Sequence, residues 1–253
     1  MPDRREPAQA RRFLVTWRDG EKPPGLHAVG ALLADGGNYT FRYLVDVLRA
    51  PGFRPFPGLG DRDKLYRSST LFLFFADRVM DRRRPEYNDY LRALDLPPHA
   101  SLEDVLARSE GVLKGDRVAV VEEPSVGQDG STTHVFVVRG LRFAVPDPVR
   151  REALLADLGP GVPVSVRDDT SNPVSPEALH LMAPSGEPFG WVPDALVHYV
   201  RSVVATPGST VVVQRRNGPD LPPHIRLLVR VSGFLPAGVP ALPPLGQDVP
   251  VPF

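Results

Sequence analysis

Cysteine is absent from the chain of 253 residues. Disulfide bonds, thiolate zinc sites, iron–sulfur clusters and cysteine nucleophiles are therefore excluded. A long apolar run is also missing, since no stretch approaches the ~20 residues that a membrane-spanning helix needs. The N-terminal stretch MPDRREPAQARRFLVTW is charged and lacks the apolar segment of a secretory signal. We therefore expect a cytoplasmic protein with no membrane partner.

A net charge is lacking as well, because 30 Lys and Arg residues balance 30 Asp and Glu residues. Any site for a polyanion therefore has to be local. Basic residues exceed acidic ones by ten to five between positions 42 and 84, and by five to one between positions 199 and 230. Nearly all of them are Arg, which suits contacts with phosphate. The alternative is a solvated face, which we favour for Arg82–Arg84 and leave open for Arg215 and Arg216.

Motifs of common enzyme classes are missing too. GLGDRD and GGNYTF match neither the dinucleotide-binding pattern nor the P-loop, and no G-x-S-x-G elbow is present. The six histidines include no i, i+4 pair that would place two imidazoles on one helix face. Adjacent acidic residues such as Asp168 and Asp169 point to opposite faces of a strand. We therefore expect no enzyme activity, no catalytic residue, no metal site and no cofactor.

Proline, by contrast, is abundant, and its 30 residues cluster between periodic segments, which favours short strands joined by rigid turns. In the first half, RFLVTW, LHAVGALLAD and YTFRYL read as strands, and DGGN predicts a hairpin between the last two. Helices are predicted from Ser69 or Thr70 onward, over RPEYNDYLRALDL, and over SLEDVLARSEG with Ser101 as its cap. After about residue 112, short strand-like segments such as STTHVFVVRGLRFA predominate, with helices predicted in DPVRREALLADLG and VPDALVHYVRSV.

These patterns predict an α+β fold with two domains. We expect a charged leader (1–20), a domain with a small β-sheet and helices (21–111), a bent sheet or barrel with two helices (112–235), and a Pro-rich tail (236–253). The domain boundary is open between Gly111 and Thr132.

Several aromatic residues have a predicted location. Phe72–Phe75 and Trp191 are expected in the core, because aromatic residues in periodic segments usually bury. Phe189 and Trp191 alternate on one strand, so the alternative for both is a ring available for stacking, and the position of Phe189 is left open. Phe53 and Phe56 lie in a Pro-rich loop, where they either cover the first domain or contact a partner.

The stretch from Thr170 to Pro176 predicts a tight polar turn, because Pro173 and Pro176 fix φ and restrict the residues before them. Asn172 and Ser175 then have side chains available for their own backbone or for a ligand. The segments ALHLM and PFGWVP, joined by PSGE, predict a hairpin that displays this turn.

The order VVRGLRF, VRDDTSNPVSPEALHL and GEPFGWVP resembles the HIRAN domain, over roughly Thr133 to Val204. HIRAN domains resemble modified OB-type barrels, and in eukaryotic helicase-like chromatin proteins the domain captures the free 3′ end of single-stranded DNA. The resemblance therefore implies a HIRAN-like β-barrel that binds single-stranded DNA or a DNA end.

The same resemblance implies roles for individual residues. Phe143 falls near the strand aromatic that stacks a terminal base in DNA-binding members. Members that bind DNA commonly carry Tyr and Asp where this chain has Val174 and Ser175, and Ser175 can hydrogen-bond a hydroxyl without the charge of Asp. With nearby arginines added, the candidate nucleic-acid-binding residues are Arg142, Phe143, Arg167, Asn172, Ser175, Arg215 and Arg216.

The segments HAVGAL, YTFRYL, GFRPFP and LFLFFADRVM resemble the N-terminal β-rich subdomain of HipA-type kinases, over about Leu26 to Leu96. The kinase domain that follows in that family has no counterpart here, so the resemblance implies a docking module for a protein partner. Two hypotheses stay open. The chain is either a non-catalytic nucleic-acid-binding module or a protein–protein adaptor whose second half is only structural.

Overall fold

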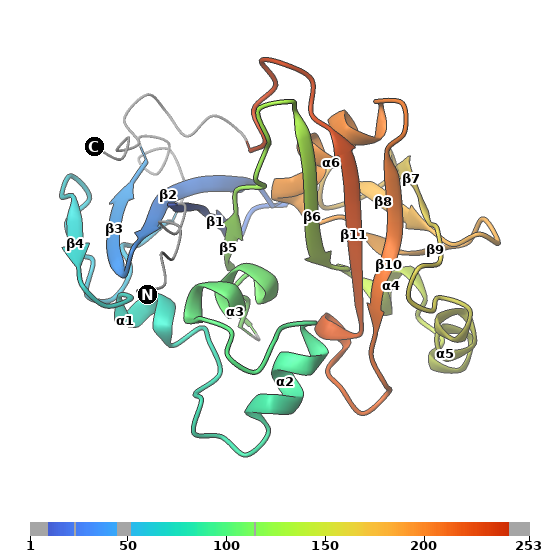
Figure 1. The fold of residues 1–253 in the computed structure, drawn as a ribbon, viewed down its shortest axis with the longest axis horizontal. Coiled ribbons are helices and arrows are strands. Elements are labelled where there is room, and N and C mark those ends of the chain that lie inside the picture. Colours follow the sequence, from blue (N-terminus) through green and yellow to red (C-terminus); the bar gives the residue numbers. More distant parts are fainter. Residues whose placement is uncertain (1–9, 23, 45–51, 114, 243–253) are drawn as a thin grey trace, which may run out of the picture.

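The computed structural model describes residues 10–22, 24–44, 52–113 and 115–242 (Figure 1). These residues form mixed α and β structure with several antiparallel sheets, which confirms the predicted α+β class. Among the described residues none of the sheets closes into a barrel, so the HIRAN-like β-barrel predicted for the second half is not found. Residues 1–9 of the predicted leader and residues 243–253 of the predicted tail lie outside the described residues. Among the helices of the described part, none has the length and apolar character needed to cross a membrane.

The elements follow one another from β1 to β11, with their bounds as follows. The strands are β1 (Arg11–Arg18), β2 (Leu26–Asp35), β3 (Asn38–Tyr43), β4 (Tyr66–Ser68), β5 (Val118–Glu122), β6 (Ser131–Val137), β7 (Ser165–Asp168), β8 (Leu179–Met182), β9 (Pro188–Trp191), β10 (Thr210–Arg216) and β11 (Leu227–Phe234). The helices are α1 (Leu73–Ala76), α2 (Tyr87–Ala93), α3 (Leu102–Ser109), α4 (Leu141–Ala144), α5 (Pro148–Ala156) and α6 (Val197–Val204), with single 3₁₀ turns at η2 (Asp194–Leu196) and η3 (Pro223–Ile225).

The first sheet has the strand order β4-β3-β2-β1-β5 and is antiparallel throughout. The predicted DGGN hairpin joins β2 to β3, where Asp35 pairs with Asn38 and the two intervening glycines have positive φ. Two strands of this sheet come from outside the range expected for the first domain. β1 sits between β2 and β5 although it falls within the leader expected over residues 1–20, and β5 pairs with β1 although it follows residue 112. Both placements depend on pairing between strands that are distant in sequence, and the alternation of apolar and polar residues does not reveal which strands pair.

Helices α1 to α3 lie along the lower side of the first sheet in Figure 1. α3 begins with the capping box that its sequence predicts, because Ser101 and Asp104 each accept a hydrogen bond from the other's backbone N–H. α1 is shorter than predicted and forms only one turn after Phe72. The backbone N–H of Thr70 donates to Ser68 Oγ, so these short side chains stabilise a turn instead of a longer helix.

The core of the first half is rich in aromatic side chains. Phe53 and Phe56 of the Pro-rich loop are each 5% exposed, so they complete the core of the first half. The hydroxyl of Tyr43 accepts a hydrogen bond from Phe56 N–H at 2.6 Å and donates to the Leu59 carbonyl at 2.8 Å, which fixes the loop. Within Phe72–Phe75, Phe75 is fully buried and the other aromatic rings pack against the same core, as predicted.

The second half contains two three-stranded antiparallel sheets, with the orders β10-β11-β6 and β7-β8-β9. They are linked to neighbouring segments by isolated bridges, one between Arg139 and Trp191 and one between Pro163 and Val212. Helices α5 and α6 are confirmed within their predicted segments, and α6 packs on β11.

The strand predicted up to Ala144 ends earlier, at Val137. Gly140, with φ of 66°, turns the chain into the single helical turn α4. A Cβ atom at this position would lie 2.5 Å from the Trp191 ring, so the chain here requires glycine for both backbone and space. Because β6 ends before this turn, it pairs along β11 and does not curve round to close a barrel.

The two halves share their hydrophobic cores. Leu14, Ala31 and Val121 from the first sheet belong to the core cluster of the second half. Ile225 of η3 in turn belongs to the core cluster of the first half, together with Phe13. The first sheet is therefore covered on both faces, and this shared burial holds the two halves against each other.

Candidate nucleic-acid interface

A row of three side chains crosses the sheet β7-β8-β9. Arg167 pairs with His180, and His180 pairs with Trp191, so the three side chains project from the same face. The rings of His180 and Trp191 lie 4.8 Å apart at 30°. Val166, Leu181 and their neighbours on the opposite face pack in the second core. We call Arg167, His180 and Trp191 the ring row.

Asp169 anchors this row. Its carboxylate is 7% exposed and accepts hydrogen bonds from Trp191 Nε1 and Asn172 Nδ2, each at 2.9 Å, and His180 Nε2 lies 3.1 Å away. Burial alone would raise the pKa of Asp169, but the hydrogen bonds from Trp191, Asn172 and Ser171 lower it to about 2. The carboxylate is therefore ionised at neutral pH and fixes the direction of the indole.

The polar turn predicted after residue 170 is present and is held by Asn172. Asn172 Oδ1 accepts hydrogen bonds from the backbone N–H groups of Val174 at 2.9 Å and Ser175 at 3.1 Å. Since Asn172 Nδ2 donates to Asp169, the side chain is largely committed to the turn. Asn172 thus shapes this loop, whereas Ser175 keeps its hydroxyl for other contacts.

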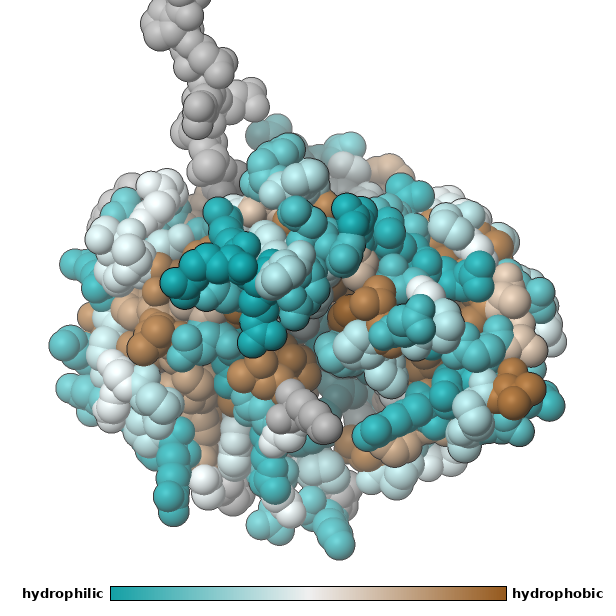
Figure 2. All heavy atoms as spheres, turned by 90° about the horizontal axis from the view of Figure 1, so that it is seen from below, coloured by the Kyte–Doolittle hydropathy of each residue, from teal (hydrophilic) through white to brown (hydrophobic). Residues whose placement is uncertain are grey.

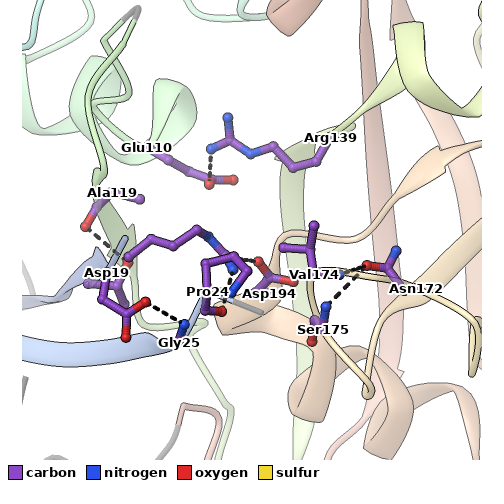
Figure 3. A network of polar contacts seen from close by, with 12 residues as sticks. Asp19, Pro24, Gly25, Glu110, Ala119, Arg139, Asn172, Val174, Ser175 and Asp194 are labelled. Carbon is purple, nitrogen blue, oxygen red and sulfur yellow. Dashed lines mark hydrogen bonds and ion pairs between the residues drawn. The ribbon is translucent and has the colours of Figure 1, made fainter. Parts of the chain in front are cut away.

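Ser175 faces a cleft of about 540 Å³ between the two halves. Arg18 of β1 pairs with Asp194 at this cleft, and Figure 3 shows Val174 and Ser175 close to Asp194 and Pro24. Glu177 also lines the cleft, so one arginine meets two carboxylates there. Apolar contacts come from Leu14, Leu26, Ala28, Ala195 and Val197.

Phe143 lies in α4, so the prediction of a strand at this position is wrong. Its ring is 66% exposed, and the guanidinium carbon of Arg142 stands 4.7 Å from the ring centroid. Gly140, which starts the turn, packs directly against the Trp191 ring, and α4 as a whole packs on β9. The turn that carries Phe143 therefore packs on β9, the strand that ends at Trp191.

The four predicted arginines divide into two groups. Arg142, Arg167 and Arg216 are exposed, and within the described ranges none of them forms an ion pair of 4 Å or less, although the charge of Arg216 helps to lower the pKa of Glu152. Arg215 instead lies 3.6 Å from Asp95 at the end of α2 and braces β10 against the first half. Three of the four guanidinium groups are thus available for phosphates.

Three residues of this surface were not selected from the sequence as binding residues. Asp169 and His180 were considered only for catalysis or metal binding, and Trp191 was expected in the core. The hairpin β8-β9 has a register shift after Leu181, so sequence alone could not place His180 opposite Trp191. The alternation in ALHLM was the available signal, since it puts His180 on the face opposite to Leu181. Phe189, whose position was left open, is fully buried.

A second hollow, of about 870 Å³, lies on the lower side, between the segment from Ala76 to Tyr90 and the loop that ends at Ile225. Figure 2 shows this side as mostly hydrophilic, with small scattered hydrophobic areas and a hollow between two masses. Its rim carries both charges, as in the Arg84–Glu86 pair at 3.9 Å. Nothing in it selects a ligand, and no group of three or more His, Asp or Glu residues suited to a metal occurs in the described part of the chain.

Comparison with known proteins adds no relative: no family model, no curated protein and no solved structure matches the chain. The resemblances to HIRAN domains and to the HipA subdomain therefore stay predictions.

Proposed function

We propose that this chain binds single-stranded nucleic acid, including a strand end, through its second half and without transforming it. The observation that carries the proposal is Phe143, whose side chain is 66% exposed on a turn that packs on β9, with the guanidinium carbon of Arg142 4.7 Å from its ring centroid. Aromatic rings are usually buried, and exposed rings next to cations are typical of sites where bases stack. The resemblance to HIRAN domains, which covers the same segments, supports the same function.

The ring row and Phe143 contribute differently to binding. Arg167 is exposed at the β7 edge of the sheet, His180 and Trp191 are partly buried, and Phe143 is exposed on α4, which packs on β9 at the other edge. A base that stacks on Phe143 gains about 1–3 kcal/mol without any sequence preference. Arg142 is close enough to bind the phosphate beside that base.

The cleft at Ser175 suits an uncharged part of the polymer. Arg18 is already paired with Asp194, and Glu177 adds a second carboxylate, so a phosphate would be repelled. The Ser175 hydroxyl and the apolar contacts fit a sugar or a base instead. This arrangement supports recognition of a terminal nucleoside, with the phosphates held outside by the exposed arginines.

Fluorescence anisotropy with a labelled single-stranded oligonucleotide tests the proposal. Phe143→Ala should weaken binding by about 5- to 150-fold, the equivalent of 1–3 kcal/mol of lost stacking. Phe234→Ala is the matched control, because Phe234 is also exposed, at 48%, but lies at the far end of β11 from α4. It should leave the affinity unchanged.

Two results would contradict this function. One is absence of oligonucleotide binding at ~50 mM salt, where phosphate contacts are strong. The other is equal affinity of Phe143→Ala and the unmodified protein. Either result favours the alternative of a protein–protein adaptor that uses the first half.

A further inference from the structure

Two ion pairs of opposite polarity connect the halves near the ring row. Arg18 of β1 pairs with Asp194 of η2, and Glu110 after α3 pairs with Arg139 before α4. Figure 3 shows Glu110 and Arg139 facing each other, with Asp194 in the same view. In one pair the first half supplies the cation, and in the other it supplies the anion.

Both second-half partners flank Trp191. Arg139 and Trp191 exchange two backbone hydrogen bonds, each of 2.9 Å. Asp194 follows Trp191 by three residues and begins η2. The two ion pairs therefore hold the segment that is hydrogen-bonded to Trp191 and the turn that follows Trp191, while Asp169 accepts a hydrogen bond from the indole nitrogen.

Glu110 has almost no access to water. Its side chain is 4% exposed, Arg139 satisfies one carboxylate oxygen, and the other oxygen has no hydrogen-bond partner. A buried carboxylate with a single cationic partner depends strongly on that partner. The position of Arg139, and with it the backbone opposite Trp191, is thus tied to the first half.

We infer that Arg18 and Glu110 are positioning residues through which the first half sets the orientation of Trp191, and with it the affinity of the ring row. The effect on affinity rests on the proposed function, whereas the effect on Trp191 does not. The first half is then a part of the binding site and more than a neighbouring docking module.

Trp191 itself can report on this coupling. The chain has two tryptophans, Trp17 and Trp191, so Trp17→Phe leaves a single fluorescent reporter in the full-length protein. In this background, Arg18→Glu should increase the quenching of Trp191 by acrylamide and weaken oligonucleotide binding by about fivefold or more. The charge swap Arg18→Glu with Asp194→Arg restores the pair with the original net charge, so it should recover both quenching and affinity.

The control reverses a charge that lies in another exposed pair. Arg92→Glu changes the Arg92–Asp89 pair on α2, both of whose side chains are about two-thirds exposed, and it should alter neither measurement. If Arg18→Glu does not fold, Glu110→Gln replaces it, because this change removes the charge of the second pair at constant size. It should increase quenching in the same direction.

The outcomes separate the inference from the proposed function. Quenching and affinity that match the Trp17→Phe parent in the folded Arg18→Glu protein, or a charge swap that recovers neither, would overturn the inference. If quenching changes and recovers as expected but even the parent binds no oligonucleotide, the positioning of Trp191 stands and the proposed function fails.

Discussion

Replacing Asp169 by Asn should destabilise the protein by roughly 2–4 kcal/mol at neutral pH. The carboxylate accepts hydrogen bonds of 2.9 Å from Trp191 Nε1, Asn172 Nδ2 and Ser171 Oγ. An Asn side chain of the same shape can still accept from Trp191 and Asn172 with its oxygen at the Oδ2 position, and its NH₂ group can donate to the Ser171 hydroxyl, so the substitution removes the negative charge from this network. Hydrogen bonds to a charged group contribute about 1.5–3 kcal/mol each, against about 0.5–1.5 kcal/mol for neutral ones, so the loss of the charge weakens all three bonds.

The same carboxylate predicts how stability depends on pH. The pKa of Asp169 is lowered from the ordinary 3.8 to about 2, so the folded state favours the ionised form. Its contribution to the free energy of unfolding is therefore complete above about pH 4 and is lost as the pH falls through about 2. The lowered pKa corresponds to roughly 2 kcal/mol, which agrees with the lower end of the value from the hydrogen bonds.

Urea unfolding of the two proteins measures this difference. The gap in the free energy of unfolding between the unmodified protein and Asp169→Asn should be largest at neutral pH and should narrow below about pH 4. Asp168→Asn is the control, since Asp168 is next in sequence but its side chain is 63% exposed and pairs with the exposed Arg201. Equal stability of Asp169→Asn and the unmodified protein at neutral pH would refute the anchoring role of Asp169, as would a gap that does not narrow in acid.

Two further predictions concern phosphate contacts and the turn before α4. The logarithm of oligonucleotide affinity should fall with the logarithm of salt concentration with a slope of about −2, because the three unpaired arginines contribute about −0.7 each on a single strand. An anisotropy titration measures this slope, and a slope near zero would exclude phosphate contacts by these arginines. Gly140→Ala should cost more stability in urea unfolding than Gly186→Ala. Both glycines have positive φ, which costs an L-residue about 1–2 kcal/mol, but only at Gly140 would the new Cβ collide with the Trp191 ring. Equal losses of stability in the two variants would show that Gly140 is needed for its backbone conformation alone.

Local signals in the sequence predicted the helices and turns well. Ser101 with Asp104 gave the start of α3, Pro148 marked the first turn of α5, and the prolines around Asn172 gave the polar turn. Each of these depends on contacts within a few residues, so the sequence carries the information directly.

Pairing between distant strands was the part that the sequence could not supply. β5 joins β1 across about a hundred residues, so its alternation looked equally suited to the second half. The ring row depends on the register of β8 against both neighbours, and the shift after Leu181 changes that register by one residue. Arg167 was selected from its neighbourhood in sequence, whereas its alignment with His180 and Trp191 appears only once the three strands are paired.

Exposure of the ring, more than the count of basic residues, distinguishes the proposed stacking surface in this neutral protein. Lys64 stands 5.2 Å from the ring centroid of Tyr66 on β4, which in sequence looks as suitable as Arg142 and Phe143. The Tyr66 ring, however, packs against the first core, and its hydroxyl bonds with the backbone of Asp61, so no base can lie on it without disturbing that core. The Phe143 side chain is 66% exposed and is not part of a core. Of these two pairs of a basic and an aromatic residue, the Arg142–Phe143 pair is therefore the one on which a base could stack without disturbing a core.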